Sequence, residues 1–254
     1  MRQIAITNQK GGSAKSTTTV NLAAALGERK RRVLVIDLDP QANSTSWLSP
    51  SPLRPGAFEL LTGREPLHGL VHETSAHGVT IIPANRDLAD VERLLAREIA
   101  AESILKRRIS ELDAAAWDYV LIDTPPTLGL LTIGALAAAQ ELIVPVEAHV
   151  LALSGVAQLL ETVGKVRERL NPGLRMAGIV ACRVDARTRH ALDVVDSLEQ
   201  TFGQAMYKVR IRENVRLAEA PSFHQAITVY DGRCTGAEDY RALADEVVAQ
   251  ETKE

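Results

Sequence analysis

The chain has 254 residues, of which 46% are hydrophobic and 24% charged, and its formal net charge is −3. This length and apolar content suit one large α/β domain, and no Pro/Gly/Ser-rich linker divides the chain, so we expect a single domain over residues 1–254. No stretch approaches the roughly 18 apolar residues that a membrane-spanning helix needs. Met1 and Arg2 lead directly into an apolar run, which predicts no signal peptide. The two cysteines form no CxxC pair and suit a reducing cytoplasm.

Short apolar runs alternate with helical stretches, a pattern typical of a doubly wound α/β fold with a mostly parallel sheet flanked by helices. The predicted strands are Ile4–Ile6, Val33–Ile36, Val79–Ile82, Tyr119–Ile122, Leu142–Val146, Ala177–Ala181 and Met206–Val209. The predicted helices are Ser16–Arg29, Asp87–Leu112, Leu130–Ala139, Leu153–Leu170, Arg189–Phe202 and Gly236–Gln250. The segment Leu48–Leu67 contains four prolines and predicts a loop around a short helix.

A phosphate-binding loop is predicted after the first strand, where residues 10–17 read KGGSAKST and precede a helix. Gly11 and Gly12 allow backbone N–H groups to approach a polyphosphate, and the helix N-terminus adds its positive end. In this layout Lys15 reaches the β- and γ-phosphates, and the Ser16 hydroxyl reaches a Mg²⁺ ion. The sequence therefore predicts a nucleotide site at this loop.

The strict phosphate-loop pattern is not met, because Gln9 and Ala14 stand where its two glycines should be. Ala14 occupies the place of the glycine that normally precedes the loop lysine and permits positive φ. Alanine at positive φ costs on the order of 1 kcal/mol, so we expect nucleotide binding to survive, while the effect on turnover stays open. Lys10 is a second lysine, and it would crowd the phosphates that Lys15 already serves unless it points elsewhere.

Two acidic segments also follow predicted strands directly. Asp37 and Asp39 point the same way on an extended segment, so one carboxylate would organise Lys15 or Mg²⁺-bound water and the other would position an attacking water. Asp123 ends another apolar strand and is followed by Thr-Pro-Pro. Because ligands bind at the carboxyl ends of strands in a doubly wound sheet, all three segments should converge on one nucleotide site.

These segments together resemble the deviant Walker A ATPases of the ParA/MinD superfamily, and its Soj/ParA partition branch in particular. The resemblance extends from Gln3 to about Val248 and rests on four blocks, KGGSAKST, VIDLDPQANST, VLIDTPPTLGLLTIGAL and ENVRLAEAPS. It implies a P-loop NTPase fold, ATP and Mg²⁺ as cofactors, and slow hydrolysis of ATP to ADP and phosphate. The N-terminal helix-turn-helix domain of larger relatives is not expected here, which argues against operator-specific repression.

The resemblance also implies roles for individual residues. Lys10 would reach across a homodimer interface to the partner's nucleotide, Asp39 would position the attacking water, and Asp123 would contact Mg²⁺ through water. The catalytic group is then Lys10, Lys15 and Asp39, and the metal group is Ser16, Asp39 and Asp123. The residues expected to bind the cofactor are Lys10, Gly11, Gly12, Ser13, Ala14, Lys15, Ser16, Thr17, Asp37, Asp123 and Asn214.

The C-terminal block departs from the family pattern. Soj-like proteins carry Pro-Arg-Asn where this chain has Arg212-Glu213-Asn214, which leaves the contact of Asn214 with the base open. Arg187 and Arg216 match arginines that hold DNA in related proteins, and the DNA-binding set expected here is Arg187, Arg189, Arg212 and Arg216. Guanidinium groups would pair with phosphates without reading bases, so binding should be sequence-independent and salt-sensitive.

Two other functions within the superfamily are disfavoured. A MinD-type membrane anchor needs a basic amphipathic C-terminal helix, but acidic residues outnumber basic ones in residues 235–254. An iron–sulfur protein needs clustered thiolates, but Cys182 and Cys234 lie outside the phosphate and switch loops.

We therefore expect an ATPase in chromosome or plasmid partition. It would form a homodimer with ATP, bind nonspecific double-stranded DNA, work with a ParB-type protein, and be cytoplasmic and nucleoid-associated without a membrane partner. Two alternatives remain: positioning of another cytoplasmic cargo on the nucleoid, and an ATP- and DNA-binding module that hydrolyses little because of Ala14.

Overall fold

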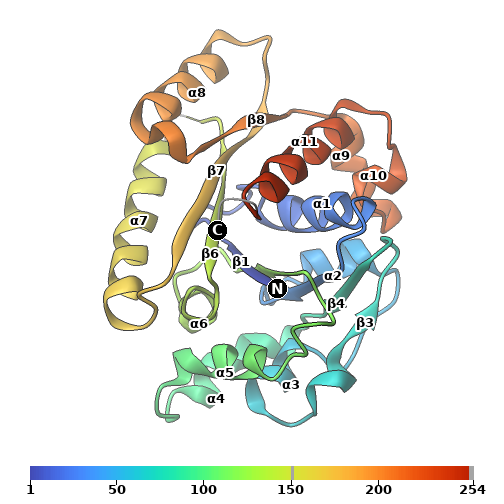
Figure 1. Ribbon diagram of the computed structural model, residues 1–254, viewed down its shortest axis with the longest axis vertical. Helices are drawn as coiled ribbons and strands as arrows, with labels where there is room; N and C mark the ends of the chain where they lie inside the picture. Colours follow the sequence, from blue (N-terminus) through green and yellow to red (C-terminus); the bar gives the residue numbers. More distant parts are fainter. Residues whose placement is uncertain (150–151, 252–254) are drawn as a thin grey trace.

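A computed structural model describes residues 1–149 and 152–251. In this part of the chain, eight strands form one sheet in the order β3-β4-β2-β5-β1-β6-β7-β8, shown in Figure 1. Every neighbouring pair is parallel except β3–β4 at one edge. The predicted doubly wound, mostly parallel sheet is confirmed.

The elements alternate between strands and helices along the chain. The strands are β1 (Arg2–Ile6), β2 (Val33–Asp37), β3 (His72–Glu73), β4 (Val79–Ile82), β5 (Tyr119–Asp123), β6 (Glu141–Glu147), β7 (Arg175–Val184) and β8 (Met206–Arg212). The α-helices are α1 (Lys15–Glu28), α2 (Asn43–Leu48), α3 (Ala57–Thr62), α4 (Val91–Leu95), α5 (Ile104–Ser110), α6 (Leu130–Ala138), α7 (Ala152–Arg169), α8 (Arg189–Phe202), α9 (Val215–Glu219), α10 (Ile227–Tyr230) and α11 (Thr235–Ala249). Short 3₁₀ turns are η1 (Leu67–Leu70), η2 (Arg86–Asp90), η3 (Ala101–Ser103), η4 (Gly203–Ala205) and η5 (Ala220–Phe223).

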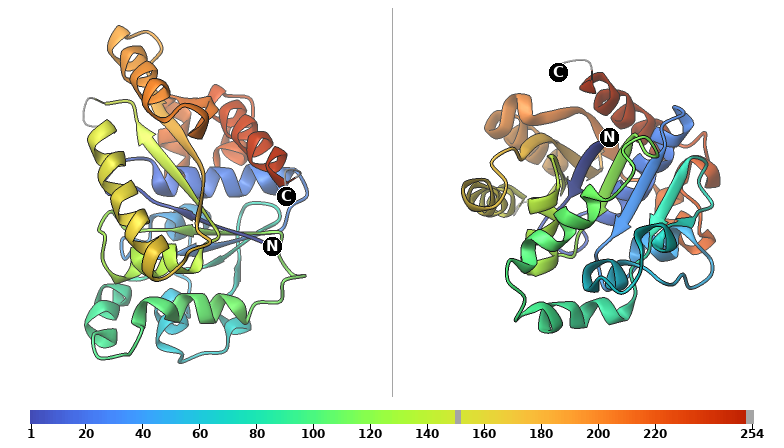
Figure 2. Two further views of the ribbon diagram at one scale, coloured as in Figure 1. Left: turned by 60° about the vertical axis from the view of Figure 1, so that its left-hand side comes forward. Right: turned by 60° about the horizontal axis from the view of Figure 1, so that its bottom comes forward.

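Helices cover both faces of the sheet because its central strands are apolar on both sides. Successive side chains of a strand point to opposite faces, so Ile4 and Ile6 of β1 pack in one core cluster and Ala5 packs in the other. The first cluster contains α1 and α11, which lie side by side, and the second contains α3, α5 and α6. Figure 2 shows these two layers from two further directions.

One predicted element is wrong: residues 87–112 do not form a continuous helix. The chain instead forms η2, α4, η3 and α5, and Ala100 between α4 and η3 has a φ of 55°. Buried Leu95 and Leu105 are ten positions apart, which on one helix would separate them by about 80°. Breaking the helix lets both short segments turn an apolar side toward the same core.

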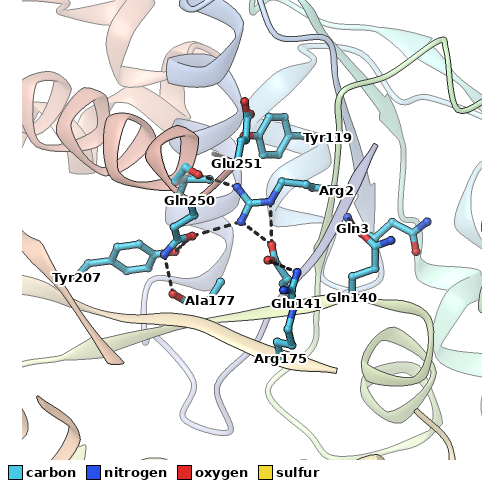
Figure 3. Close-up of polar contacts among 11 residues, drawn as sticks. Arg2, Gln3, Tyr119, Gln140, Glu141, Arg175, Ala177, Tyr207, Gln250 and Glu251 are labelled. Atoms are coloured by element: carbon cyan, nitrogen blue, oxygen red, sulfur yellow. Dashed lines mark hydrogen bonds and ion pairs between the residues drawn. The ribbon is translucent and has the colours of Figure 1, made fainter. Parts of the chain in front are cut away.

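A polar network joins the end of α11 to the amino end of the sheet (Figure 3). The Arg2 guanidinium donates to the Glu141 carboxylate at 2.6 Å and to the Val247 carbonyl at 2.6 Å. Tyr119 of β5 donates to Glu251, just beyond α11. These contacts hold α11 beside β1, whose opposite, carboxyl end carries the phosphate loop.

Across residues 1–149 and 152–251, none of the helices has the length and apolar character needed to cross a membrane.

Candidate nucleotide site

The phosphate loop follows β1 and leads into α1. Gly12 has a φ of 75° and Ala14 a φ of 65°, so both residues occupy the left-handed region that favours glycine. A Cβ atom added at Gly11 would meet nothing within 4 Å, which leaves that side of the loop open. The positive φ expected at position 14 is confirmed, and the loop is formed despite the strain of about 1 kcal/mol that alanine brings.

Lys15 is the first residue of α1 and is held inside the loop. Its ammonium group donates to the backbone carbonyl of Lys10 at 3.3 Å, and its side chain is buried. Burial lowers the pKa of Lys15, while the carboxylates of Asp123 and Asp39 act in the opposite direction. A polyphosphate in the loop would add further negative charge beside this buried cation.

Asp37 ends β2 and lies beneath the loop that follows it. Its Oδ1 accepts from the Asp39 backbone N–H at 3.0 Å, and its Oδ2 accepts from the Thr45 backbone N–H at 2.9 Å and the Thr45 hydroxyl at 2.7 Å. Thr45 Oγ1 also accepts from the Ala84 backbone N–H at 2.9 Å. The structure therefore uses both Asp37 oxygens to shape the loop after β2, and its expected role in cofactor binding stays a prediction.

Asp39 lies nearer the ligand space than Asp37. Its Oδ1 accepts from the Gln41 backbone N–H at 2.9 Å, which turns the chain toward α2. Asp39 also lines the cavity over the phosphate loop, and its charge reaches Lys15. Asp39 therefore borders the space over the phosphate loop, and its role in positioning a water stays a prediction.

Asp123 ends β5 and is fully buried. Its Oδ2 accepts from the Ser44 hydroxyl at 2.7 Å, whereas its Oδ1 has no hydrogen-bond partner among the residues that the structure describes. Burial raises the pKa of Asp123 to about 6, although the Ser44 and Ser16 hydroxyls and the Lys15 charge oppose this shift. Of the two carboxylate oxygens, Oδ1 is therefore the one without a hydrogen-bond partner in the described residues.

These donors fit a magnesium ion that arrives with a nucleotide. Mg²⁺ at phosphate sites is held by one or two carboxylates together with phosphate oxygens and waters. Ser16, Asp39 and Asp123 supply oxygen ligands of this kind, and the unpartnered Asp123 oxygen needs such a partner. No cluster of three or more His, Cys, Asp or Glu side chains able to hold a metal alone occurs in the described ranges 1–149 and 152–251.

Lys10 lies at the outer edge of the loop. Its ammonium group is 3.1 Å from Glu147 Oε2, and Arg183 contacts the other oxygen of this carboxylate at 3.6 Å. Burial raises the pKa of Glu147, but the two cations outweigh burial and the net shift is downward. The Lys10 ammonium group is therefore paired with Glu147 within the subunit, and its role toward the nucleotide of a second subunit stays a prediction.

Two adjoining cavities provide room for a ligand. A cavity of about 440 Å³ lies over the phosphate loop, and a second of about 1010 Å³ extends from it between β7, β8 and α9. Both volumes fall in the range typical of small-molecule sites. The residues that line both cavities are Ala14, Thr17, Trp47, Arg183 and Pro221. The site therefore has space for a polyphosphate and for the nucleoside attached to it.

Comparisons with known proteins agree with this geometry. A family model described as an AAA domain matches residues 1–176, more than half of the chain. The chain is 45% identical over 250 residues to the chromosome-partitioning ATPase Soj of Thermus thermophilus, covering 98% of this chain and 96% of the relative. It is 42% identical over 248 residues to the sporulation initiation inhibitor protein Soj of Bacillus subtilis, covering 97% and 98%.

The chain belongs to the Soj/ParA family.

A solved structure of a P-loop relative agrees with the fold. Cobyrinic acid a,c-diamide synthase from Mycobacterium smegmatis, with bound ADP and magnesium, is 35% identical and aligns with a TM-score of 0.87 over 99% of this chain and 96% of its own. The four sequence blocks predicted the family and the fold, and both predictions are confirmed.

The C-terminal block contains Asn214, the residue whose contact with the base the sequence leaves open. Asn214 precedes α9, and its Oδ1 accepts from the Leu217 backbone N–H at 3.1 Å, which caps the helix. Its Nδ2 donates to Thr235 Oγ1 at 2.7 Å. Asn214 lines the larger cavity, but both ends of its amide already have partners, so its contact with a base stays a prediction.

The four arginines proposed to bind DNA differ in their surroundings. Arg187 pairs with Asp185 at 2.8 Å, and 87% of its side chain is exposed. Arg189 begins α8 and is exposed. Arg187 also lines the rim of the larger cavity, so positive charge lies close to the nucleotide site.

Arg216 and Arg212 are more strongly paired. Arg216 contacts Glu219 at 3.0 Å and Asp231 at 3.7 Å with 58% of its side chain exposed. Arg212 donates through two nitrogens to the buried Asp239 carboxylate, at 2.6 and 3.0 Å. A DNA phosphate would have to compete with the Asp239 carboxylate for this guanidinium group. Of the four arginines, Arg212 is therefore the one held most firmly by its partner.

Residues that sequence patterns did not single out complete the site. Ser44 and Thr45 hold Asp123 and Asp37, Glu147 holds Lys10, and the Trp47 indole N–H donates to the Gln225 carbonyl at 2.7 Å. Ser44 and Thr45 lie inside the block VIDLDPQANST, five and six positions after Asp39. Their hydroxyl groups, so close to the predicted site in sequence, could have marked them as candidate partners of the site carboxylates. The sequence offers less reason to single out Glu147 as the partner of Lys10, because a charged residue at the end of a strand is common.

Proposed function

We propose that this chain is an ATPase that uses ATP and Mg²⁺ to switch between a free and a DNA-bound state in chromosome or plasmid partition. One observation carries the proposal: Lys15 at the start of α1, Asp39 after β2 and Asp123 at the end of β5 lie close enough for their charges to interact. Lys15 and Asp39 also line the cavity over the phosphate loop. The name of the Thermus thermophilus relative, a chromosome-partitioning ATPase, supports the biological setting.

Hydrolysis in such a site depends on positioning and charge neutralisation more than on covalent chemistry. Lys15 and the backbone N–H groups of the loop hold the phosphates, and Asp39 orients the attacking water. Ser16 and Asp123 hold the Mg²⁺ ion, which neutralises charge on the phosphate oxygens when it is bound. The strained Ala14 lies beside the lysine that contacts the phosphates, which favours slow turnover.

Assembly then links nucleotide to DNA. Lys10 of each subunit extends to the nucleotide of the partner subunit, so ATP joins two copies into a homodimer. Arg187, Arg189, Arg212 and Arg216 of the two subunits would then form a basic surface for nonspecific double-stranded DNA. A ParB-type protein speeds hydrolysis and releases the dimer, which makes the protein cytoplasmic and nucleoid-associated. Residues 1–254 form one ATPase domain.

Phosphate release tests the enzymatic part of this proposal. The purified chain with Mg²⁺ and ATP should release phosphate slowly, and faster with random duplex DNA and a ParB-type partner. The Asp39→Ala variant should bind ATP and DNA but release no phosphate, whereas Asp113→Ala, at an exposed aspartate away from the site, should behave as wild type. Normal turnover by Asp39→Ala would overturn the assignment of the water-positioning residue.

The same assay separates the second candidate function, which the φ of Ala14 favours. A chain that binds ATP and DNA but shows no turnover under any of these conditions would be an ATP-dependent DNA-binding module. Stimulation by a cargo protein other than a ParB-type partner would instead indicate a nucleoid-based positioning ATPase.

A further inference from the structure

The Ser44 hydroxyl is directed at one oxygen of the Asp123 carboxylate. The donor lies on α2 and the acceptor at the end of β5, 79 positions apart in sequence, with 2.7 Å between the two oxygens. Both residues are fully buried, so no water competes for this hydrogen bond. A neutral hydroxyl donor leaves the negative charge of the carboxylate in place, unlike an arginine or lysine at the same position.

We propose that Ser44 is a positioning residue that orients Asp123 toward the Mg²⁺ ion of the bound nucleotide, an inference that rests on the proposed function. Ser44 engages Oδ2 and so fixes the rotation of the carboxylate. Oδ1 is then the oxygen that remains without a hydrogen-bond partner in the described residues. A side chain that orients a metal-binding carboxylate in this way commonly affects metal affinity by about 10–100-fold.

Contacts elsewhere on α2 indicate that Ser44 is not needed simply to hold this helix. Thr45 anchors α2 to Asp37 through its backbone N–H and its hydroxyl. The Trp47 indole anchors the other end of α2 to the Gln225 carbonyl. With these anchors in place, removal of the Ser44 hydroxyl changes what Asp123 contacts rather than where α2 lies.

The position of Ser44 also connects two parts of the proposed chemistry. Ser44 follows Asp39 by five residues on the same short segment, and its hydroxyl reaches the carboxylate at the end of a different strand. The segment that carries the proposed water-positioning residue therefore also orients the proposed metal-binding residue.

The test separates metal binding from nucleotide binding. Calorimetric titration with ADP, first in EDTA and then at graded MgCl₂ concentrations, gives the nucleotide affinity and the apparent Mg²⁺ affinity separately. Ser44→Ala should weaken apparent Mg²⁺ affinity by about tenfold or more while leaving the metal-free ADP affinity unchanged. Ser44→Cys, which keeps a weak donor of similar size, should fall between Ser44→Ala and wild type.

Two controls make the result specific. Ser49→Ala removes a hydroxyl at the end of α2 that donates only to the Ser51 carbonyl, and it should titrate as wild type. In the Asp123→Asn background, Ser44→Ala should cause no further loss of Mg²⁺ affinity, because the group it orients is already gone.

The outcomes distinguish this inference from the proposed function. If the wild-type chain binds ADP without any response to Mg²⁺, both the proposed function and this inference are overturned. If wild type responds to Mg²⁺ but both Ser44 variants keep full Mg²⁺ affinity, or lose metal-free ADP affinity equally, the positioning role alone is overturned.

Discussion

The ammonium group of Lys10 and the carboxylate of Glu147 form an ion pair within one subunit, 3.1 Å apart. The Lys10 side chain is 41% exposed, and an exposed pair of this kind contributes about 0–1 kcal/mol to stability. A pair that weak opens readily when a more highly charged anion comes within reach. The Lys10 side chain can therefore leave Glu147 at little cost in free energy. This is consistent with a role in binding the nucleotide of a second subunit.

Replacement of Lys10 should separate nucleotide binding from assembly. Lys10→Ala should bind ATP with an affinity close to wild type, because Lys15 still holds the phosphates, but it should remain monomeric. Equilibrium dialysis and sedimentation velocity measure the two properties, with Lys106→Ala, at an exposed lysine of α5, as the matched control. An unchanged ATP-dependent dimer in Lys10→Ala would remove Lys10 from the interface.

The strain at Ala14 predicts a gain of stability on substitution. Ala14→Gly should raise the free energy of unfolding of the nucleotide-free chain by about 1 kcal/mol, because glycine adopts a φ of 65° without the Cβ clash. Urea denaturation measures this change, and ATP affinity and turnover should rise with it.

Ala100 offers a control for that substitution. It has a φ of 55° and is exposed on the turn before η3, on a different segment from the phosphate loop. Ala100→Gly should stabilise the chain by a similar amount and leave ATP binding unchanged. If Ala14→Gly and Ala100→Gly affect nucleotide binding alike, the loop strain has no functional effect.

Two buried carboxylates predict a pH dependence of stability. Burial, with repulsion from Asp123, raises the pKa of Asp37 from 3.8 to about 8, and burial raises that of Asp123 to about 6. The carboxyl groups of Asp37 and Asp123 therefore bind protons more tightly in the folded chain than in the unfolded chain. The stability that protonation of these two groups contributes is present at low pH and is lost as pH rises toward 8.

The Asp123→Asn variant tests this dependence without nucleotide. The asparagine side chain does not titrate, whereas Asp123 of the wild-type chain loses its proton as pH rises. The free energy of unfolding of Asp123→Asn should therefore increase relative to that of wild type between pH 5 and pH 8. Denaturant titrations at several pH values measure the difference. A difference between the two proteins that stays constant with pH would contradict it.

Reversal of charge at Arg216 should remove DNA binding selectively. Arg216→Glu should keep ATP binding and dimerisation, lose affinity for random duplex, and show a shallower dependence of the remaining binding on salt. Arg93→Glu is the matched control, since Arg93 is exposed and pairs with Asp90 three residues away much as Arg216 pairs with Glu219. Undiminished duplex binding by Arg216→Glu would move the DNA surface elsewhere.

Much of the fold could be predicted from local patterns. The buried strands β1, β2 and β5 are apolar runs in the sequence, and the glycines and lysine after β1 are enough to indicate the phosphate loop. The break between α4 and α5 was missed because the spacing of apolar residues on each side looks helical, and only the shared core requires the turn at Ala100.

The contacts that complete the site could not be predicted in the same way. Ser44 meets Asp123 across 79 positions, and Lys10 meets Glu147 across 137. Such pairs depend on the order of the strands in the sheet, which places β5 beside both β1 and β2 and places β6 on the other side of β1. A sequence pattern indicates that strands exist, but it does not by itself determine their neighbours.

ATP-dependent assembly on DNA can be measured by sedimentation velocity of the purified chain with Mg²⁺ and ATP, Mg²⁺ and ADP, or no nucleotide, each repeated with a random DNA duplex. We expect a dimer with ATP alone, and co-sedimentation of that dimer with duplex that is lost as salt rises. A chain that stays monomeric and leaves the duplex unbound when saturated with Mg²⁺ and ATP would contradict the proposed switch.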